Sequence, residues 1–288
     1  MKSKIFSIAL TLFAVCALFA EPPKAAKVTR SYHRHHKHYG KGEYFQLSRG
    51  QYGYLIYFQW VKPTQNQEDQ VLIGLPEPNF WSGFNRRGMF DLVINGISVF
   101  NLEPKEITVF NTPEKAGINA LYNFDGVWMN IRLFMDDKTP LLHVECTKEA
   151  KTVKQVNSIM LNINVSPTVT GLKPNAYKRE IITPVSVYNK YAWQKLKKED
   201  NCFFMYDALN EGSVKKPKTN GPAFLKVDRS VWESARVHYG KASSISFQFK
   251  IKPQAEKICF SMLELKTKNT NSQFADFLHK NNLLEKKK

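Results

Sequence analysis

Two dipeptides in the middle of the chain, Asn95-Gly96 and Asp125-Gly126, constrain the fold more than any other feature of the sequence. Each stands between short runs rich in apolar and β-branched residues. Asn-Gly and Asp-Gly favour type I′ hairpin turns, because both central residues of such a turn adopt positive φ. From Gly88 to Val165 further turn signals recur roughly every eight to twelve residues, a spacing typical of all-β proteins. The pattern predicts an antiparallel sheet at the centre of the protein.

The later part of the chain carries related patterns. Ser244–Ile251 alternates between polar and apolar residues, as a strand with one buried face does. Cys202–Tyr206 is apolar and predicts a fully buried strand. Pro184 predicts an edge position, because proline donates no hydrogen bond to a ladder. We therefore expect an all-β protein, a large antiparallel two-sheet β-sandwich of the supersandwich kind, with a short C-terminal helix.

The first twenty residues have the composition of a secretory signal peptide. Lys2 and Lys4 precede the uncharged apolar run Ile5–Phe19, and Ala20 marks the expected cleavage point. The apolar run is shorter than the roughly 20 residues of a membrane-spanning helix, which favours a signal peptide over an anchor. We expect residues 1–20 to be removed and the protein to be exported to the periplasm, the cell surface or the extracellular space. No other stretch predicts a transmembrane segment.

Three further regions follow the signal peptide. Residues 21–42 are predicted to be a disordered linker, because they are rich in Pro, Lys and Ala and lack apolar periodicity. Residues 43–265 are predicted to form one β-sandwich domain, and residues 266–288 an amphipathic helix with a basic tail. The linker holds four closely spaced histidines, interrupted by basic residues and joined by no acidic or thiol ligand, so we expect no dedicated metal site. They are His33, His35, His36 and His38.

The formal net charge is +17 at pH 7, and much of it lies in the two tails. A nucleic-acid interface needs a clustered basic stripe interleaved with aromatic residues, and the body of the chain shows none. A basic exported protein suits an acidic polysaccharide or an anionic membrane surface. The expected partner is a polysaccharide or acidic glycan, and nucleic acid is not expected.

Three cysteines remain after the signal peptide: Cys146, Cys202 and Cys259. Their wide spacing and the absence of a CxxC pair predict neither a zinc site nor a disulfide framework. Two alternatives stay open, one disulfide with a leftover thiol or three buried thiols. The chain contains no GxSxG, P-loop or HExxH motif, and no cofactor is predicted.

His143 and Glu145 are candidate catalytic residues. They are two residues apart in the predicted strand Leu141–Thr147, so both side chains point to the same face. A histidine and a carboxylate on a concave sheet face can act as an acid/base pair on a sugar hydroxyl. The alternative, which we favour, is that both residues simply lie on the solvent-facing side of an amphipathic strand.

A second candidate is the pair of neighbouring acids Asp136-Asp137. We favour a solvated turn over a calcium site there, because the alternating oxygen ligands of a calcium loop are missing.

The loop from Pro76 to Gly88 combines proline and glycine with aromatic and basic residues. Contiguous exposed aromatics mark a binding surface unless they pack away from water. The candidate ligand-binding residues are Trp81, Phe84, Asn85, Arg86 and Arg87, with Trp81 stacking on a sugar ring. The alternative is a loop that plugs one end of the sandwich. Of the five tryptophans, we expect Trp81 to be partly exposed and most of the others to lie in or beside the core.

The order of these features resembles a group of uncharacterised exported bacterial β-sandwich proteins. The resemblance is carried by Gly74–Phe84, by the hairpin Phe90–Ile97, and by Ile181–Pro184 followed by Cys202–Tyr206. Such chains are similar in architecture to the large sandwiches of the galactose mutarotase and polysaccharide-processing group. The resemblance implies a carbohydrate site, although His143 and Glu145 do not align with the histidine and carboxylate of mutarotases.

We therefore expect an exported, non-catalytic carbohydrate-binding protein. The alternatives are a structural or interaction protein of the cell envelope, and a sugar-active enzyme of the epimerase or polysaccharide lyase kind.

Overall fold

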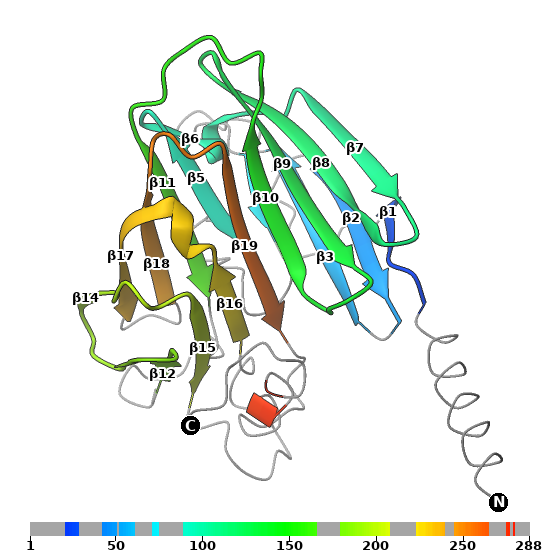
Figure 1. Ribbon diagram of the computed structural model, residues 1–288. Coiled ribbons are helices and arrows are strands. Elements are labelled where there is room, and N and C mark those ends of the chain that lie inside the picture. The colour runs from blue at the N-terminus through cyan, green and yellow to red at the C-terminus, as the bar shows by residue number, and fades with distance from the viewer. Residues whose placement is uncertain are drawn as a thin grey trace, which may run out of the picture.

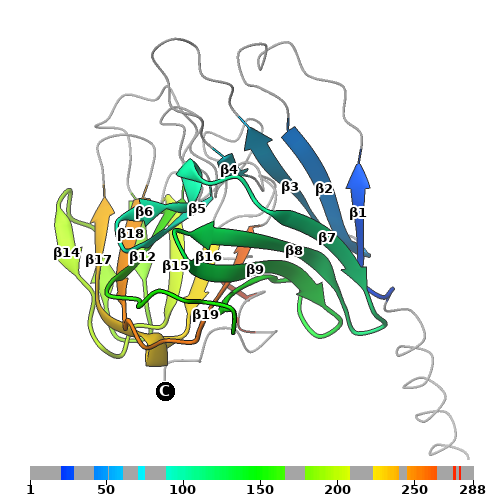
Figure 2. The ribbon, with the colours of Figure 1, turned by 90° about the horizontal axis from the view of Figure 1, so that it is seen from above.

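The structure is a computed structural model that describes residues 21–28, 42–50, 52–60, 71–74, 89–165, 179–207, 223–239, 245–264, 275–276 and 279. These residues form three antiparallel sheets arranged in two layers (Figures 1 and 2). The prediction of a large antiparallel β-sandwich is confirmed. Among the described residues, no helix is long and apolar enough to cross a bilayer.

A nine-stranded sheet forms one layer of the sandwich. In spatial order its strands are β13 (Val187–Tyr188), β12 (Arg179–Ile182), β15 (Cys202–Asp207), β16 (Ala223–Val227), β19 (Lys257–Glu264), β10 (Leu142–Lys148), β9 (Val127–Asp136), β8 (Lys115–Phe124) and β7 (Glu106–Asn111). The two-residue strand β13 is an edge strand, as Pro184 predicts.

A six-stranded sheet and a four-stranded sheet form the other layer. The six-stranded sheet consists of β14 (Trp193–Lys195), β17 (Trp232–Tyr239), β18 (Ile245–Ile251), β11 (Ile159–Val165), β5 (Phe90–Ile94) and β6 (Ile97–Ser98). The four-stranded sheet consists of β1 (Lys24–Val28), β2 (Gly42–Arg49), β3 (Tyr52–Trp60) and β4 (Val71–Gly74). Two 3-10 turns, η3 (Val99–Asn101) and η6 (Arg229–Val231), connect strands.

Strand β1 lies inside the segment predicted to be a linker, and the prediction is wrong for this part. β1 pairs with β2, and the side chain of Ala25 is buried. The backbone N–H of Ala25 donates to Asn111 Oδ1 at 2.8 Å, and Asn111 Nδ2 donates back to the Ala25 carbonyl at 3.0 Å. A partner strand and a reciprocal side-chain contact thus order a segment whose composition alone predicts disorder.

The two hairpin predictions are confirmed in their backbone geometry. Asn95 and Gly96 have φ of 50° and 84°, and Asp125 and Gly126 have φ of 50° and 93°. Positive φ at both central residues is the signature of the type I′ turn.

The main core fills the space between the layers. It includes the edge-to-face pair Phe90–Phe260, with ring centroids 5.2 Å apart, and the pair Phe203–Phe247, with centroids 5.0 Å apart. A second, smaller cluster lies on the outer face of the nine-stranded sheet and comprises Leu141, Cys202, Phe204, Phe224 and Leu263. β15 is therefore buried on both faces, as its apolar sequence predicts.

Ala275 packs against this second cluster. It belongs to the segment predicted as the C-terminal helix, most of which lies outside the described residues. All three described cysteines are free; Cys146 and Cys202 are buried and Cys259 is half-buried.

The last two strands in the described part of the chain, β18 and β19, connect its two halves. β18 pairs with β11 in the six-stranded sheet, and β19 pairs with β10 in the nine-stranded sheet. In each of these two sheets, the strands up to β11 lie on one side of this pairing and the strands from β12 onward lie on the other.

Candidate functional site

The outer face of the nine-stranded sheet over β7 to β10 carries an array of polar side chains. Along β8 and β9 buried and half-buried residues alternate, so every second residue points outward. The register places Thr108, Asn119, Arg132 and Glu145 in one row across four strands. The alternation thus brings residues of distant sequence position onto one rigid surface.

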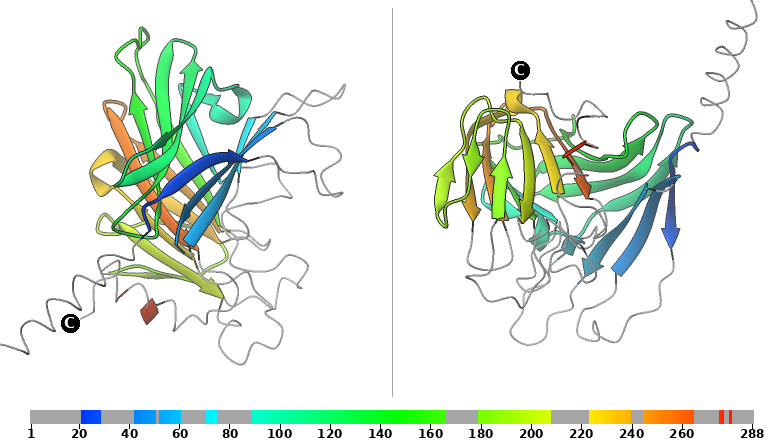
Figure 3. Two further views of the ribbon diagram at one scale, coloured as in Figure 1. Left: turned by 90° about the vertical axis from the view of Figure 1, so that its right-hand side faces the viewer. Right: turned by 90° about the horizontal axis from the view of Figure 1, so that it is seen from below.

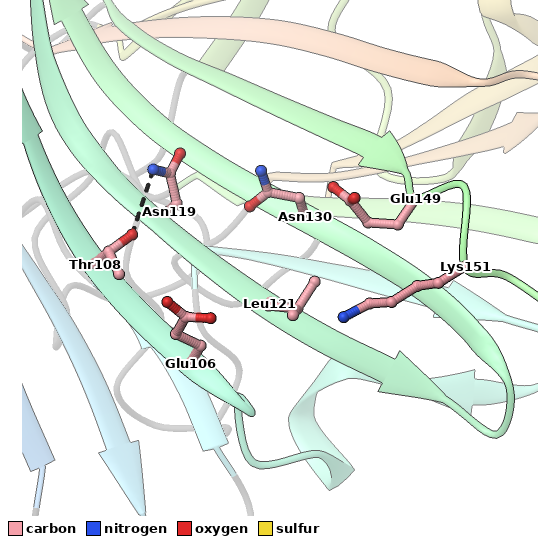
Figure 4. Close-up of a pocket in the computed structure, with 7 residues that line it drawn as sticks. All are labelled: Glu106, Thr108, Asn119, Leu121, Asn130, Glu149 and Lys151. Atoms are coloured by element: carbon pink, nitrogen blue, oxygen red, sulfur yellow. Dashed lines mark hydrogen bonds between the residues drawn. The ribbon is translucent and has the colours of Figure 1, made fainter.

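A hollow of about 230 Å³ lies on this face (Figure 4). It is lined by Glu106, Thr108, Asn119, Leu121, Asn130, Glu149 and Lys151. Six of these seven side chains are polar, and together they offer carboxylates, amides, a hydroxyl and an ammonium group. The volume is below the roughly 300–1,000 Å³ of sites for drug-sized ligands, so it suits a ligand of about one ring.

The side chains at one end of the hollow are held by their neighbours. Arg132 Nε donates to Asn119 Oδ1 at 2.9 Å, and Asn119 Nδ2 donates to Thr108 Oγ1 at 3.4 Å. The Arg132 guanidinium lies over the Phe110 ring at 5.1 Å. These contacts fix which end of the Asn119 amide is the donor, and they pre-orient that end of the site.

The other end of the hollow is bounded by residues 149–151, which follow β10. The Lys151 ammonium lies 3.9 Å from the centre of the Trp128 ring, a cation–π contact that places this charge at the rim. Trp128 is half-buried on the outward side of β9.

His143 and Glu145 share this outer face but do not line the hollow. Glu145 forms an ion pair with Lys257 at 2.9 Å. His143 Nδ1 lies 2.9 Å from Ser261 Oγ, and its ring stacks on Phe134 with centroids 5.0 Å apart.

The remaining ring nitrogen of His143 contacts the turn after β9. Its Nε2 lies 3.2 Å from Asp136 Oδ2 and 3.2 Å from Thr139 Oγ1. Asp136 Oδ1 accepts the backbone N–H groups of Lys138 and Thr139 at 3.0 and 2.8 Å. Burial raises the pKa of Asp136, but the hydrogen bonds from His143 and these N–H groups outweigh burial and hold the pKa well below its usual value. Asp136 thus caps this turn.

Several predicted residues lie outside the described part of the chain. They are the loop residues Trp81, Phe84, Asn85, Arg86 and Arg87, and the histidines His33, His35, His36 and His38. Among the residues that the structure does describe, no group of three or more His, Cys, Asp or Glu side chains is placed to hold a metal.

The sequence interpretation did not single out the residues of the hollow. Their signal is a pair of amides, Asn119 in β8 and Asn130 in β9, each between buried apolar residues. The tryptophans also differ from one another. Trp232 is buried and Trp128 is half-buried, as expected of most of the tryptophans, whereas Trp193 is 46% exposed.

No protein-family model matches the chain, and no curated protein matches it by sequence. Among solved structures, the alpha-N-acetylgalactosaminidase NagBb of Bifidobacterium bifidum, in complex with GalNAc, matches with a TM-score of 0.45 and 7% identity. The match covers 83% of this chain and 36% of that one, so this chain spans about a third of the enzyme's length.

Two other solved structures show likeness at a similar level. A protein assigned as an aldose 1-epimerase from Klebsiella pneumoniae subsp. pneumoniae has a TM-score of 0.44 and 10% identity, with 85% of this chain and 84% of that one covered. The GH36 alpha-galactosidase AgaB of Geobacillus stearothermophilus has a TM-score of 0.35 and 11% identity over 83% of this chain and 41% of that one. We draw no residue correspondence from likeness at this level.

Proposed function

We propose that this protein binds carbohydrate and that the hollow of Figure 4 holds one sugar ring. The observation that carries the proposal is the composition of the hollow, in which six polar side chains from three strands and an adjoining turn surround a ring-sized space. Sugar hydroxyls both donate and accept hydrogen bonds. Amide groups can both donate to and accept from a sugar hydroxyl, and carboxylates can accept from it. A rigid sheet surface holds these groups in place.

The proposed function is binding without catalysis. A general acid or base must come within hydrogen-bond reach of the proton that it transfers. His143 and Glu145 lie outside the hollow, and each is engaged with a neighbour on the sheet. This arrangement supports a positioning role in the sheet for both side chains.

A second candidate function, a sugar-active enzyme, is favoured by one observation. Glu106 and Glu149 both line the hollow, and a pair of carboxylates flanking a glycosidic bond is the usual equipment of glycoside hydrolysis. We rank the enzyme second because the hollow has room for about one sugar ring, whereas a glycosidic bond joins two.

The proposal includes export and a second contact with the glycan. Residues 1–20 would direct the chain out of the cytoplasm, and the loop residue Trp81 would stack on a neighbouring part of the glycan. Both features rest on sequence patterns alone.

A glycan-array screen of the protein tests the proposal, with Asn130→Ala, Trp81→Ala and His143→Ala run beside it. Asn130→Ala removes a hydrogen-bonding amide from the hollow and should weaken binding about fivefold to tenfold, since one such bond contributes about 1 kcal/mol. Asn189→Ala, an exposed asparagine beside the edge strand β13, is the matched control. Binding to no glycan by the folded protein would overturn the proposal.

The same screen separates the two candidate functions. Release of free sugar from a bound glycan, lost in Glu106→Gln and Glu149→Gln, would favour the enzyme. Retained binding with no turnover favours the binding protein.

A further inference from the structure

The outer face of the six-stranded sheet carries a second surface with different chemistry. Trp193, in the three-residue edge strand β14, pairs with His238 of β17 and is 46% exposed. The views in Figures 2 and 3 place β14 and β17 at the opposite end of the molecule from β1 and β2, next to which β7 and β8 lie. This surface therefore lies on a different sheet from the hollow of Figure 4.

Two side chains of β17 support Trp193. The Arg236 guanidinium lies 4.3 Å from the centre of the indole ring, and the His238 ring lies 5.0 Å from it at an interplanar angle of 38°. The Arg236 and His238 side chains both project from β17, so the indole of Trp193 lies across this strand. Nearly half of the Trp193 residue remains exposed to solvent. An aromatic ring held in this way is a platform for another flat or apolar ring face.

A ladder of polar contacts leads from Trp193 across the sheet. Arg236 Nε donates to Gln248 Oε1 at 2.7 Å, and Gln248 Nε2 donates to Asn162 Oδ1 at 3.1 Å. The strands involved are β14, β17, β18 and β11, and at about 4.8 Å per step they span roughly 14 Å. The surface is thus longer than one sugar ring.

A shallow depression of about 600 Å³ follows this ladder. It is lined by Met160, Trp193, Gln194, Lys195, Ser234, Ala235, Arg236, Gln248 and Lys250. Three of these residues are cationic and none is a carboxylate. Lys250 pairs with Glu233 at 2.8 Å beside the depression, which leaves Lys195 and Arg236 as the positive charges next to Trp193.

From the exposed indole, the amide ladder and this charge balance, we infer that the outer face of the six-stranded sheet binds an acidic polysaccharide chain. Trp193 would stack on one sugar ring, Lys195 and Arg236 would contact carboxylate or sulfate groups, and Gln248 would contact hydroxyls. The inference goes beyond the proposed function, because it concerns another sheet, a longer ligand and a ligand of defined charge.

Titration of the full chain with polygalacturonate, and with neutral dextran as the comparison, tests the inference. Polygalacturonate should bind and dextran should not bind at this surface. Trp193→Ala should weaken polygalacturonate binding at least about fivefold, and Trp193→Phe should restore part of it. Lys138→Gln, an exposed lysine in the turn after β9, is the matched charge control and should have no effect.

Other outcomes overturn the inference. These are unchanged polygalacturonate binding in folded Trp193→Ala, dextran binding that Trp193→Ala weakens to the same extent, or binding only to duplex DNA or to vesicles of anionic phospholipid. Asn130→Ala, measured in parallel, keeps failure of this surface distinct from failure of the hollow, because Asn130 belongs to the other layer.

Discussion

The two outer faces of the sandwich are built by the same alternation of residues, yet they present opposite charge. The hollow on the nine-stranded sheet is lined by two carboxylates and one ammonium group, whereas the depression on the six-stranded sheet is lined by three cations and no carboxylate. On the nine-stranded face the cation Lys257 pairs with Glu145. Both faces are polar, so polarity alone does not distinguish their ligands. The net charge of each face indicates which ligand that face suits.

The two faces also differ in how tightly neighbouring strands pack against each other. Substitution of Gly117 in β8, which lies close against β9, should give the largest effect. A Cβ at Gly117 would lie 2.2 Å from the Leu133 carbonyl oxygen and 2.5 Å from Phe134 Cβ. Overpacking costs about 1–3 kcal/mol and occasionally more, so Gly117→Ala should lower the free energy of unfolding by about 3 kcal/mol. Ser234→Ala, on the open six-stranded face, should change it by less than about 0.5 kcal/mol.

Urea denaturation of both variants measures this difference. Equal midpoints would show that β9 can shift away from β8, and that the nine-stranded face is no more rigid than its counterpart.

The next effect concerns two histidines that contact aromatic rings, His143 on the nine-stranded face and His238 on the six-stranded face. His143→Ala removes contacts with Ser261 and Asp136 and should cost about 2 kcal/mol, because hydrogen bonds to charged groups contribute more than neutral ones. His238→Ala, beside the exposed Trp193, should cost well under 1 kcal/mol. Similar losses in the two variants would contradict the proposed difference.

The low pKa of Asp136 adds a pH dependence to this face. Its contribution to stability is complete above the pKa of about 3.9 for an unfolded aspartate and is lost as the pH falls toward the lower folded value. Asp136→Asn should be less stable than the wild type at neutral pH, and the gap should narrow below about pH 4. A gap that stays constant down to pH 2 would contradict the assignment.

A crossed pair of variants tests whether the faces bind independently. Trp193→Ala should weaken polygalacturonate binding about fivefold and leave neutral glycan binding unchanged, and Asn130→Ala should do the reverse. Coupled losses in both variants would indicate one shared site.

The smallest expected effect is a difference between the two faces in how ligand binding depends on ionic strength. Raising the ionic strength shortens the Debye length from about 10 Å at 0.1 M to about 3 Å at 1 M, which screens exposed charges. Polygalacturonate binding should fall, and Lys195→Gln should reduce it about twofold at low salt and not at all at high salt. Neutral glycan binding should not respond to salt.

Much of the fold was predictable because its signals are local. The turns at Asn95-Gly96 and Asp125-Gly126 need only two residues each, and the burial of Ile245, Phe247 and Phe249 follows from alternation within one strand. The strand at Lys24–Val28 was missed, because its order depends on pairing with β2 and on the side chain of Asn111.

The candidate surfaces were not predictable to the same degree. The hollow requires the register among β7, β8 and β9, together with the position of the segment that follows β10. Trp193 reads as a core residue by type, and its exposure results from the edge position of β14. The contact between His143 and Ser261 joins residues 118 positions apart, a separation that no local pattern reveals.

The position of β18 and β19 has a consequence for how the chain acquires its structure. Among the described residues these are the last two strands in sequence, and the six-stranded and nine-stranded sheets remain divided until they are in place. Long-range pairing of this kind makes folding slow, because the loops must close before the contacts form. A nascent chain that ends before Ile245 leaves the edges of β10 and β11 unpaired, and such edges are templates for aggregation. Successful folding of both surfaces therefore depends on β18 and β19, one strand in each sheet, whichever ligand each surface binds.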